Sequence, residues 1–160
     1  MTNIKDEKKQ EAKPISIKVV ASGIIPYGNG FIYVSDGGKW GLPGGRVELF
    51  EDMNLAAQRE ISEEIGAEAV VKHLVGIYVN KSDRGNHILN AVYYAEIAEG
   101  NPHIINPDEI AAIQPFSLSQ VRELYKKGQI RSGVGSLLPL EDYLRGKKFP
   151  LDAIVCLIGQ

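Results

Sequence analysis

The order of apolar and polar residues predicts strands at the start of the chain and a helix after them. β-Branched and aromatic residues dominate ISIKVVASGIIPY and GFIYVS, and the GNG between these segments predicts a hairpin turn. A Gly-rich loop with a short extended piece follows, DGGKWGLPGG. A helix is expected from about Asp52 to Ile65, because Asp52 is a suitable N-cap and Gly66 is the residue expected just past the C-terminus.

The second half of the chain predicts two longer strands, a short strand and two helices. The segments AVVKHLVGIYVN and HILNAVYYAEIA are typical of strands, and the turn-prone KSDRGN joins them. A loop with two prolines, GNPHIINPDE, leads to the short strand AAIQPFSL. The predicted helices are SQVRELYKKG, which is amphipathic, and LPLEDYLRG, with Pro139 in its first turn. These elements indicate a mixed α+β fold, in which helices pack on a largely β core.

Length and composition narrow the class of protein. The 160 residues suit one domain, and residues 1–13, rich in Lys, Glu and Gln, predict a disordered tail before a single domain at residues 14–160. A net charge of −2 lacks the basic excess typical of nucleic-acid binding. The chain has no signal-peptide core and no apolar run long enough to span a bilayer, so a cytoplasmic location is expected. The lone cysteine, Cys156, lies in AIVCLI and is expected to be a buried structural thiol.

Three glutamates of the predicted helix lie where a solvated acidic face would not place them. At about 100° per residue, Glu64 falls inside the apolar stripe of the helix, and Glu60 and Glu63 lie immediately beside it. Like charges at this spacing repel each other, and the helix dipole disfavours anions near the C-terminal end. A bound cation would offset these costs. Carboxylate oxygens with no His or Cys nearby favour Mg²⁺ or Mn²⁺ over zinc.

The turn before this helix favours the same kind of site. Gly44 and Gly45 allow the backbone to approach a ligand closely, and Pro43 stiffens the approach. A turn of this composition is unremarkable alone, but next to an acidic helix it can offer a backbone carbonyl to the same metal. A divalent metal beside bare backbone is typical of pyrophosphate binding.

The spacing of these residues resembles the Nudix box, G-x5-E-x7-R-E-U-x-E-E-x-G-U, where U is a bulky or apolar residue. Ile61 and Ala67 occupy the two apolar places, and the flanking segments extend the similarity over residues 15 to about 145. Phe50 departs from the pattern because many family members have glycine there, and we expect this change to alter the shape of the loop more than the chemistry. The matching fixed positions are Gly45, Glu51, Arg59, Glu60, Glu63, Glu64 and Gly66.

The resemblance implies the Nudix α/β/α sandwich with a mixed sheet. It also implies metal-dependent hydrolysis of a nucleoside diphosphate linked to another group X, such as a nucleotide sugar or a nucleoside triphosphate. By position, Glu63, Glu64 and the Gly44 carbonyl are metal ligands, and Glu60 is a ligand or the general base. The expected metal is Mg²⁺, with Mn²⁺ as a substitute.

The same pattern assigns supporting roles. Arg59 is expected to pair with Glu51 and to hold the loop against the helix, whereas a surface ion pair of Arg59 with Glu63 is the alternative. Gly45 and Gly66 are structural positions of the box.

The general base and the substrate stay open. We favour Glu60, because a rigid helix positions a base more reproducibly than a loop does. Glu109, in NPDEIAAIQPF, is the best candidate elsewhere, ahead of Asp108, Glu96 and Glu99. The aromatic residues that are candidates either for stacking on a base or for the core are Tyr27, Phe31, Trp40 and Tyr78.

The expected partner is a small-molecule nucleotide, without nucleic acid or membrane, and a homodimer is left open. The main alternative is a Nudix-fold binding or regulatory module that has lost catalysis, which the intact box disfavours. An isoprenyl diphosphate isomerase on the same fold is a further alternative. It is disfavoured because its chemistry needs a cysteine near the site, and Cys156 lies far along the chain.

Overall fold

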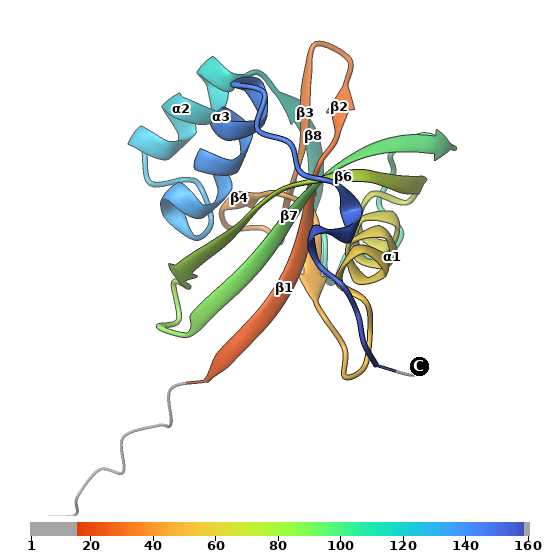
Figure 1. Cartoon of the computed structure of the whole chain (residues 1–160). Coiled ribbons are helices and arrows are strands. Elements are labelled where there is room, and N and C mark those ends of the chain that lie inside the picture. Colours follow the sequence, from red (N-terminus) through yellow and green to blue (C-terminus); the bar gives the residue numbers. More distant parts are fainter. Residues whose placement is uncertain (1–15, 159–160) are drawn as a thin grey trace, which may run out of the picture.

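The computed structural model describes residues 16–158, and the predicted tail at residues 1–13 lies outside the described residues. Within this range the strands form two four-stranded sheets (Figure 1). The strands of the first sheet, in spatial order, are β5 (Gly44–Arg46), β1 (Ile17–Ile24), β7 (His87–Glu99) and β6 (Glu68–Lys81). The strands of the second sheet are β2 (Pro26–Tyr27), β3 (Gly30–Ser35), β4 (Trp40–Gly41) and β8 (Ala112–Phe116).

The first sheet is mixed. Strands β1 and β7 run parallel, whereas β5 pairs antiparallel with β1 and β6 pairs antiparallel with β7. The predicted hairpin at GNG is confirmed, because β2 and β3 pair antiparallel across it. The sheet arrangement therefore agrees with the mixed fold predicted from the sequence.

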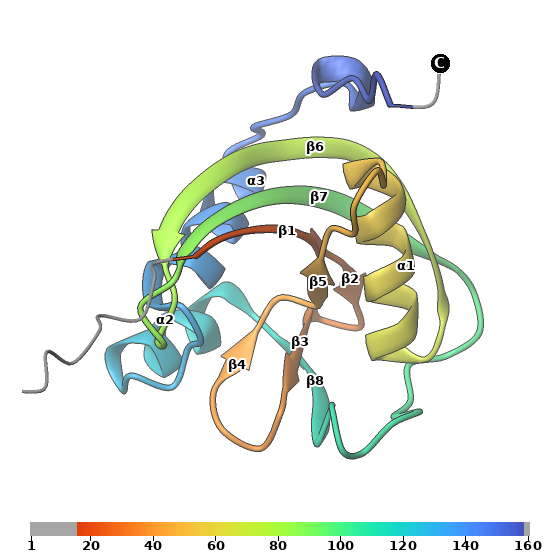
Figure 2. The same ribbon diagram turned by 90° about the horizontal axis from the view of Figure 1, so that it is seen from below.

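Helices cover both faces of the first sheet. The helices are α1 (Met53–Ile65), α2 (Leu118–Lys126) and α3 (Leu138–Leu144), with short 3-10 helices η1 (Gly133–Ser136) and η2 (Leu151–Ala153). Figure 2 shows α1 on one side of the strands and α2 with α3 on the other. Each side has its own apolar core, one containing Ile61 of α1 and the other containing Val121 of α2 and Leu140 of α3. This is an α/β/α sandwich, as the resemblance implied.

The ends of α1 lie where the capping residues predicted them. The Asp52 side chain accepts a hydrogen bond from the Asn54 N–H at 3.0 Å, which caps the N-terminus. Gly66 adopts a left-handed conformation with φ 68°, and its N–H donates to the Ser62 carbonyl. These local signals determine which glutamates of the helix share a face.

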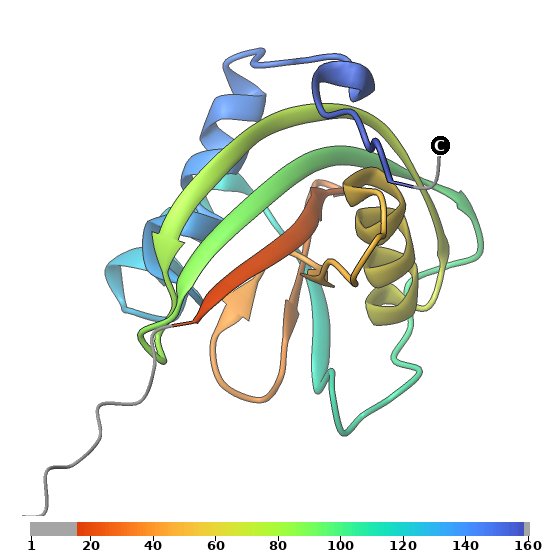
Figure 3. The same cartoon turned by 60° about the horizontal axis from the view of Figure 1, so that its bottom comes forward.

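The prediction that Cys156 is a buried structural thiol is wrong. The C-terminal segment crosses the outer side of β6 and packs Leu151 and Ile154 on the core (Figure 3). Cys156 beyond them is half-buried, between Val155 and Leu157, which are 63% and 76% exposed. The residues after Ile154 lie beyond the last turn that packs on the core. They therefore stay accessible to solvent although most of them are apolar. No helix within residues 16–158 is long and apolar enough to cross a membrane.

Candidate active site

Glu64 is an enclosed carboxylate on the side of α1 that meets β5. Its Oε2 accepts a hydrogen bond from the Gly44 N–H at 2.8 Å, which joins α1 to β5. Burial raises the pKa of Glu64 to about 7, against the lowering effects of the Gly44 hydrogen bond and the Arg131 charge. The charges of Glu60 and Glu109 raise it further. Glu64 therefore lies close to the edge strand and within reach of charges from two distant parts of the chain, at Arg131 and Glu109.

Arg59 holds the loop before α1 against the helix. Its Nε and Nη2 donate to the two carboxylate oxygens of Glu51 at 2.8 and 3.0 Å, and this fork is the predicted pairing. Glu51 also accepts from the Glu48 N–H at 2.9 Å, and Arg59 Nη2 donates to the Arg46 carbonyl at 3.2 Å. The hydrogen bond from Arg59 is the main cause that lowers the pKa of Glu51. The loop and the helix thus form one connected unit.

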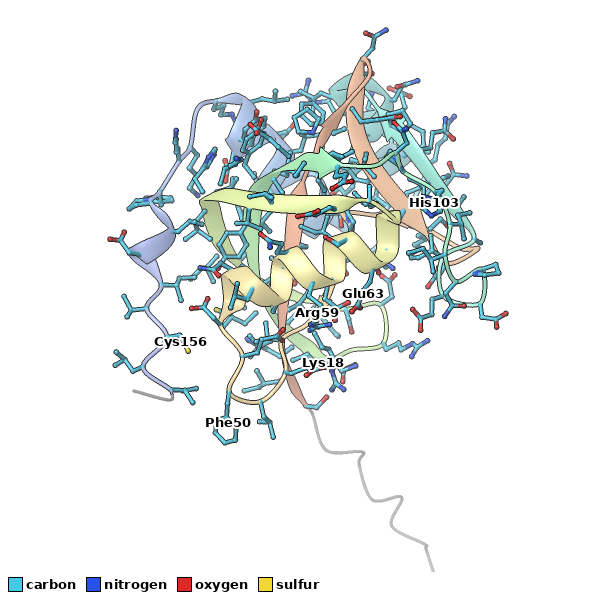
Figure 4. The ribbon with its side chains drawn as sticks, turned by 90° about the vertical axis from the view of Figure 1, so that its right-hand side faces the viewer. Lys18, Phe50, Arg59, Glu63, His103 and Cys156 are labelled. Carbon is cyan, nitrogen blue, oxygen red and sulfur yellow. The ribbon has the colours of Figure 1, made fainter. Side chains whose placement is uncertain are left out.

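The same guanidinium faces the other two helix glutamates. Arg59 Nη1 lies 2.7 Å from Glu60 Oε1 and 3.6 Å from Glu63 Oε2. Figure 4 shows Arg59 and Glu63 projecting from the same side of α1. The Glu60 carboxylate also lies against Gly45, where a Cβ atom would collide with it. Gly45 therefore permits the close contact between the helix carboxylate and β5.

These carboxylates have the right chemistry for a hard divalent cation. Across residues 16–158, no three His, Cys, Asp or Glu side chains lie close enough together to hold a metal ion. Arg59 supplies positive charge between Glu60 and Glu63, while the hydrogen bond to Gly44 engages Glu64. The donor set fits Mg²⁺ or Mn²⁺, because it offers carboxylate oxygens beside unshielded backbone. To bind such an ion together, Glu60 and Glu63 would turn away from Arg59.

The four acids proposed as alternative bases lie in different surroundings, two in β7 and two in the loop after it. Glu109 lies in the loop between β7 and β8, where its N–H donates to the Asn106 carbonyl at 3.2 Å, and its charge acts on Glu64. Glu96 instead faces solvent and lies 3.7 Å from Lys72, and Asp108 and Glu99 are exposed. Of these four acids, only Glu109 carries a charge that raises the pKa of Glu64 on α1.

Most of the candidate aromatic residues belong to the core. Trp40 packs edge-on against Phe116 with ring centroids 4.9 Å apart, and Phe31 packs against Tyr143 at 5.9 Å. The Tyr78 hydroxyl donates to Asp142 at 2.8 Å. Tyr27 is 38% exposed at the β2–β3 hairpin. None of the four lines either hollow beside β5, so the structure favours the core interpretation for Phe31, Trp40 and Tyr78.

Two hollows flank β5. The larger measures about 670 Å³, and Lys18 and Arg46 line it together with Glu60. The smaller, which we call the asparagine pocket, measures about 200 Å³ and is lined by Gly44, Gly45 and side chains that the sequence did not single out, Asn80, Asn90 and Arg131. The one local signal for this second hollow is Asn90, which interrupts the apolar run of HILNAVYY.

Comparisons with known proteins agree on a family. The family model described as the NUDIX domain matches residues 18–136. An ADP-ribose pyrophosphatase of Methanocaldococcus jannaschii is 38% identical over 64 residues, which cover 39% of this chain and 38% of that protein. A MutT-like protein of Streptomyces ambofaciens is 31% identical over 77 residues, covering 46% of this chain and 50% of that protein. The chain thus spans half or less of the length of these two relatives.

The fold itself is similar to solved structures. A NUDIX hydrolase from Nitrosomonas europaea superposes with a TM-score of 0.79 at 24% identity. The superposition covers 91% of this chain and 100% of that one. At this identity, the likeness supports the fold.

Proposed function

The chain belongs to the NUDIX domain family, and we propose that it is a metal-dependent pyrophosphohydrolase. Its proposed substrate is a nucleoside diphosphate linked to another group X, and the reaction cleaves the phosphoric anhydride bond with water. The observation that carries the proposal is the carboxylate face of α1. Glu60 and Glu64 contact the bare backbone of Gly45 and Gly44, with Glu63 beside them.

The proposed roles follow from where each group lies. Glu63, Glu64 and the Gly44 carbonyl would hold Mg²⁺ or Mn²⁺. When bound, the metal neutralises diphosphate charge and lowers the pKa of a coordinated water. Lys18 and Arg46 line the hollow beside Glu60 and offer positive charge to phosphate oxygens. The larger hollow therefore suits an anionic chain that passes along the carboxylate face.

Glu60 is the proposed general base. It sits on a rigid helix against Gly45, so it reaches the reacting region without movement of the backbone. Its carboxylate accepts from Arg59 and would take the proton of the attacking water once released from that contact. Glu109 is the second candidate, because its loop brings its charge within range of Glu64.

The supporting residues act through the loop. Glu51 and Arg59 fasten the segment between β5 and α1, so that Gly44 and Gly45 keep their positions relative to the helix. Arg59 is proposed as a positioning residue that also balances the glutamate charges before metal binds.

A hydrolysis screen tests the proposal. Purified protein is incubated with nucleoside triphosphates, nucleotide sugars, dinucleoside polyphosphates and ADP-ribose, with Mg²⁺, with Mn²⁺ or with EDTA. ADP-ribose is included because one relative is named for it. We expect turnover of at least one substrate with metal and none in EDTA. Full turnover in EDTA would refute the metal assignment. Binding without turnover across the panel would favour the regulatory module.

A cytoplasmic location and a homodimer remain predictions.

A further inference from the structure

Exposed apolar side chains gather where the loop before α1 meets the C-terminal segment. Leu49 and Phe50 belong to the loop, and Leu55 follows on the first turn of the helix. The C-terminal segment lies beside the start of the same helix and adds apolar residues of its own. We call this surface the apolar patch, and its members, each more than half exposed, are Leu49, Phe50, Leu55, Val155, Leu157 and Ile158.

The apolar patch is larger than the apolar surface that a monomer usually exposes. A single aromatic side chain offers about 150–250 Å² of surface, and the aliphatic side chains of the patch, each more than half exposed, add several hundred square ångströms. The largest apolar patch on a typical monomer covers about 300–600 Å², whereas a stable interface buries about 800 Å² on each partner. The apolar patch therefore approaches the area that a dimer of this chain needs.

Phe50 projects from the apolar patch as a knob. Its φ of 64° is a left-handed conformation that favours glycine, and Figure 4 shows its ring pointing away from the body of the molecule. Phe50 belongs to neither apolar core of the described residues. The monomer thus bears the cost of a strained backbone and of an aromatic ring in water. A contact outside the chain would offset both costs.

A hollow within the same surface is wide enough for this ring. It measures about 290 Å³ and lies between the start of α1 and the C-terminal segment. Leu151, Ile154 and Val155 give it apolar walls, and Cys156 lines it as well. A cavity of about 150 Å³ is sufficient to bind benzene. We call it the C-terminal hollow. Phe50 of the same chain does not line it.

The two ends of this surface carry opposite charge. Lys18 and Arg46 lie beside Leu49, where they outnumber Glu48. At the other end, Asp152 lines the C-terminal hollow. Within residues 16–158, none of Lys18, Arg46 and Asp152 forms an ion pair. A two-fold axis would bring the loop of each copy against the hollow of the other, so that opposite charges face each other at both contacts.

We propose that two copies of this chain associate through the apolar patch, with Phe50 of each copy in the C-terminal hollow of the other. The interface is isologous, because the same surface serves both copies and the assembly closes as a dimer. Phe50 is its anchor, since aromatic rings that fill a pocket dominate the binding energy of many interfaces. An aromatic residue thus stands where glycine would suit the backbone. It strains the dilute monomer and stabilises the dimer.

Sedimentation velocity of the full chain over a range of concentrations tests the association. We expect a reversible equilibrium between monomer and dimer. Phe50→Asn removes the ring and keeps a residue that tolerates positive φ, so this variant folds. It should raise the dissociation constant at least about tenfold, and Val155→Asn in the C-terminal hollow should raise it as well. Ile105→Asn, at an exposed apolar position outside the patch, is the matched control and should associate as the parent does.

A disulfide between copies tests the arrangement. Cys156 is the single cysteine of the chain. A double variant, Phe50→Cys with Cys156→Ser, is mixed with the parent, so positions 50 and 156 can be joined only between chains. A disulfide needs Cβ atoms about 3.5–4.5 Å apart. We expect a covalent dimer after mild oxidation, with the 50–156 link identified by mass spectrometry. Tyr27→Cys with Cys156→Ser, at the exposed β2–β3 hairpin, is the control and should not link to the parent.

A chain that stays monomeric at every concentration would overturn the proposal, as would a dimer that Phe50→Asn leaves unchanged. Equal linking by the Tyr27→Cys control would show random collision and refute the arrangement. A monomer that binds phosphatidylcholine vesicles, and loses this binding in Phe50→Asn, would assign the apolar patch to a lipid surface instead.

Discussion

The carboxylate face of α1 and the asparagine pocket lie on either side of β5, and the chain builds them in different ways. The first comes from residues 44–64, and the second from strands and turns spread over residues 20–136. The carboxylate face is internally paired, since Arg59 contacts Glu51, Glu60 and Glu63. Within residues 16–158, the Oδ1 of Asn80 has no hydrogen-bond partner and Arg131 forms no ion pair. The helix and the loop before it therefore balance their own charges, whereas the pocket brings together polar groups from separate segments without pairing all of them.

The two regions are expected to have separate functions. Variants of the carboxylate face should change catalysis and charge balance, and variants around the pocket should change recognition and the packing of η1. The predictions below test whether the two regions separate in this way.

The largest effect is expected for the general base. Glu60→Gln should lower kcat by about a hundredfold to ten-thousandfold and remove the rise in rate with pH that reports deprotonation of the base. The measurement is a pH–rate profile of Glu60→Gln and Glu109→Gln at saturating Mg²⁺. If Glu109→Gln loses the rise and Glu60→Gln recovers with more metal, the two roles are reversed.

Loss of a metal ligand should cost about a hundredfold in kcat. Glu63→Gln and Glu64→Gln remove one carboxylate each from the proposed set, and both variants should remain folded. Glu68→Gln, an exposed change at the start of β6, is the control. Full activity in the folded fraction of either ligand variant would show a structural role instead.

The enclosed carboxylate of Glu64 should also affect stability without metal. Its pKa is raised from 4.5 to about 7 chiefly by burial, so between these pH values the folded protein binds more protons than the unfolded chain. Stability should therefore fall as pH rises through this window and stay lower above it. In EDTA, Glu64→Gln should be about 1–3 kcal/mol more stable than the parent at pH 8 and equal to it near pH 4.

Urea unfolding at the two pH values measures this difference. Glu63→Gln is the matched control, because the Glu63 side chain is 62% exposed and should show a smaller dependence on pH. An equal gain in both variants would assign the effect to relief of repulsion along α1 rather than to burial of Glu64.

A moderate effect is expected on the pocket side. The buried Tyr33 hydroxyl donates to the Ser136 carbonyl at 2.7 Å and so fastens η1 to β3. Tyr33→Phe should cost about 1–2 kcal/mol, because it leaves a carbonyl unpaired. Nucleotide affinity should fall as the pocket wall loosens, while metal affinity at α1 stays unchanged. Equal losses of nucleotide and metal affinity would show that the two regions are not independent.

The smallest effect concerns the residue that departs from the box pattern. Phe50 is 76% exposed and has φ 64°, a conformation that favours glycine. Phe50→Gly should stabilise the protein by up to about 1 kcal/mol, since relief of strain exceeds the added chain entropy. Leu49→Gly is the matched control, because Leu49 is also exposed, at 88%, but has no positive φ, so glycine there should destabilise. The urea midpoint distinguishes the two signs.

The amino-acid sequence by itself determined the carboxylate face and most of the secondary structure. Asp52 and Gly66 bound α1, and helix geometry then brings residues three and four apart together, so Glu60, Glu63 and Glu64 share one face whatever surrounds them. The resemblance to the Nudix box also implied the pairing of Arg59 with Glu51, which the structure shows. Local helix geometry is sufficient only for the shared face of the three glutamates.

The tertiary structure alone decided the asparagine pocket, the position of Glu109 and the exposure around Cys156. Ser22 meets Asn90 only because β1 and β7 pair in one register, and a shift of one residue would turn Asn90 to the opposite face. Arg131 likewise reaches the pocket through pairing of its segment with Trp40. These contacts join residues that are far apart in the chain. Their free energy depends on strand pairing and core packing, which cannot be predicted from the local pattern of apolar and polar residues.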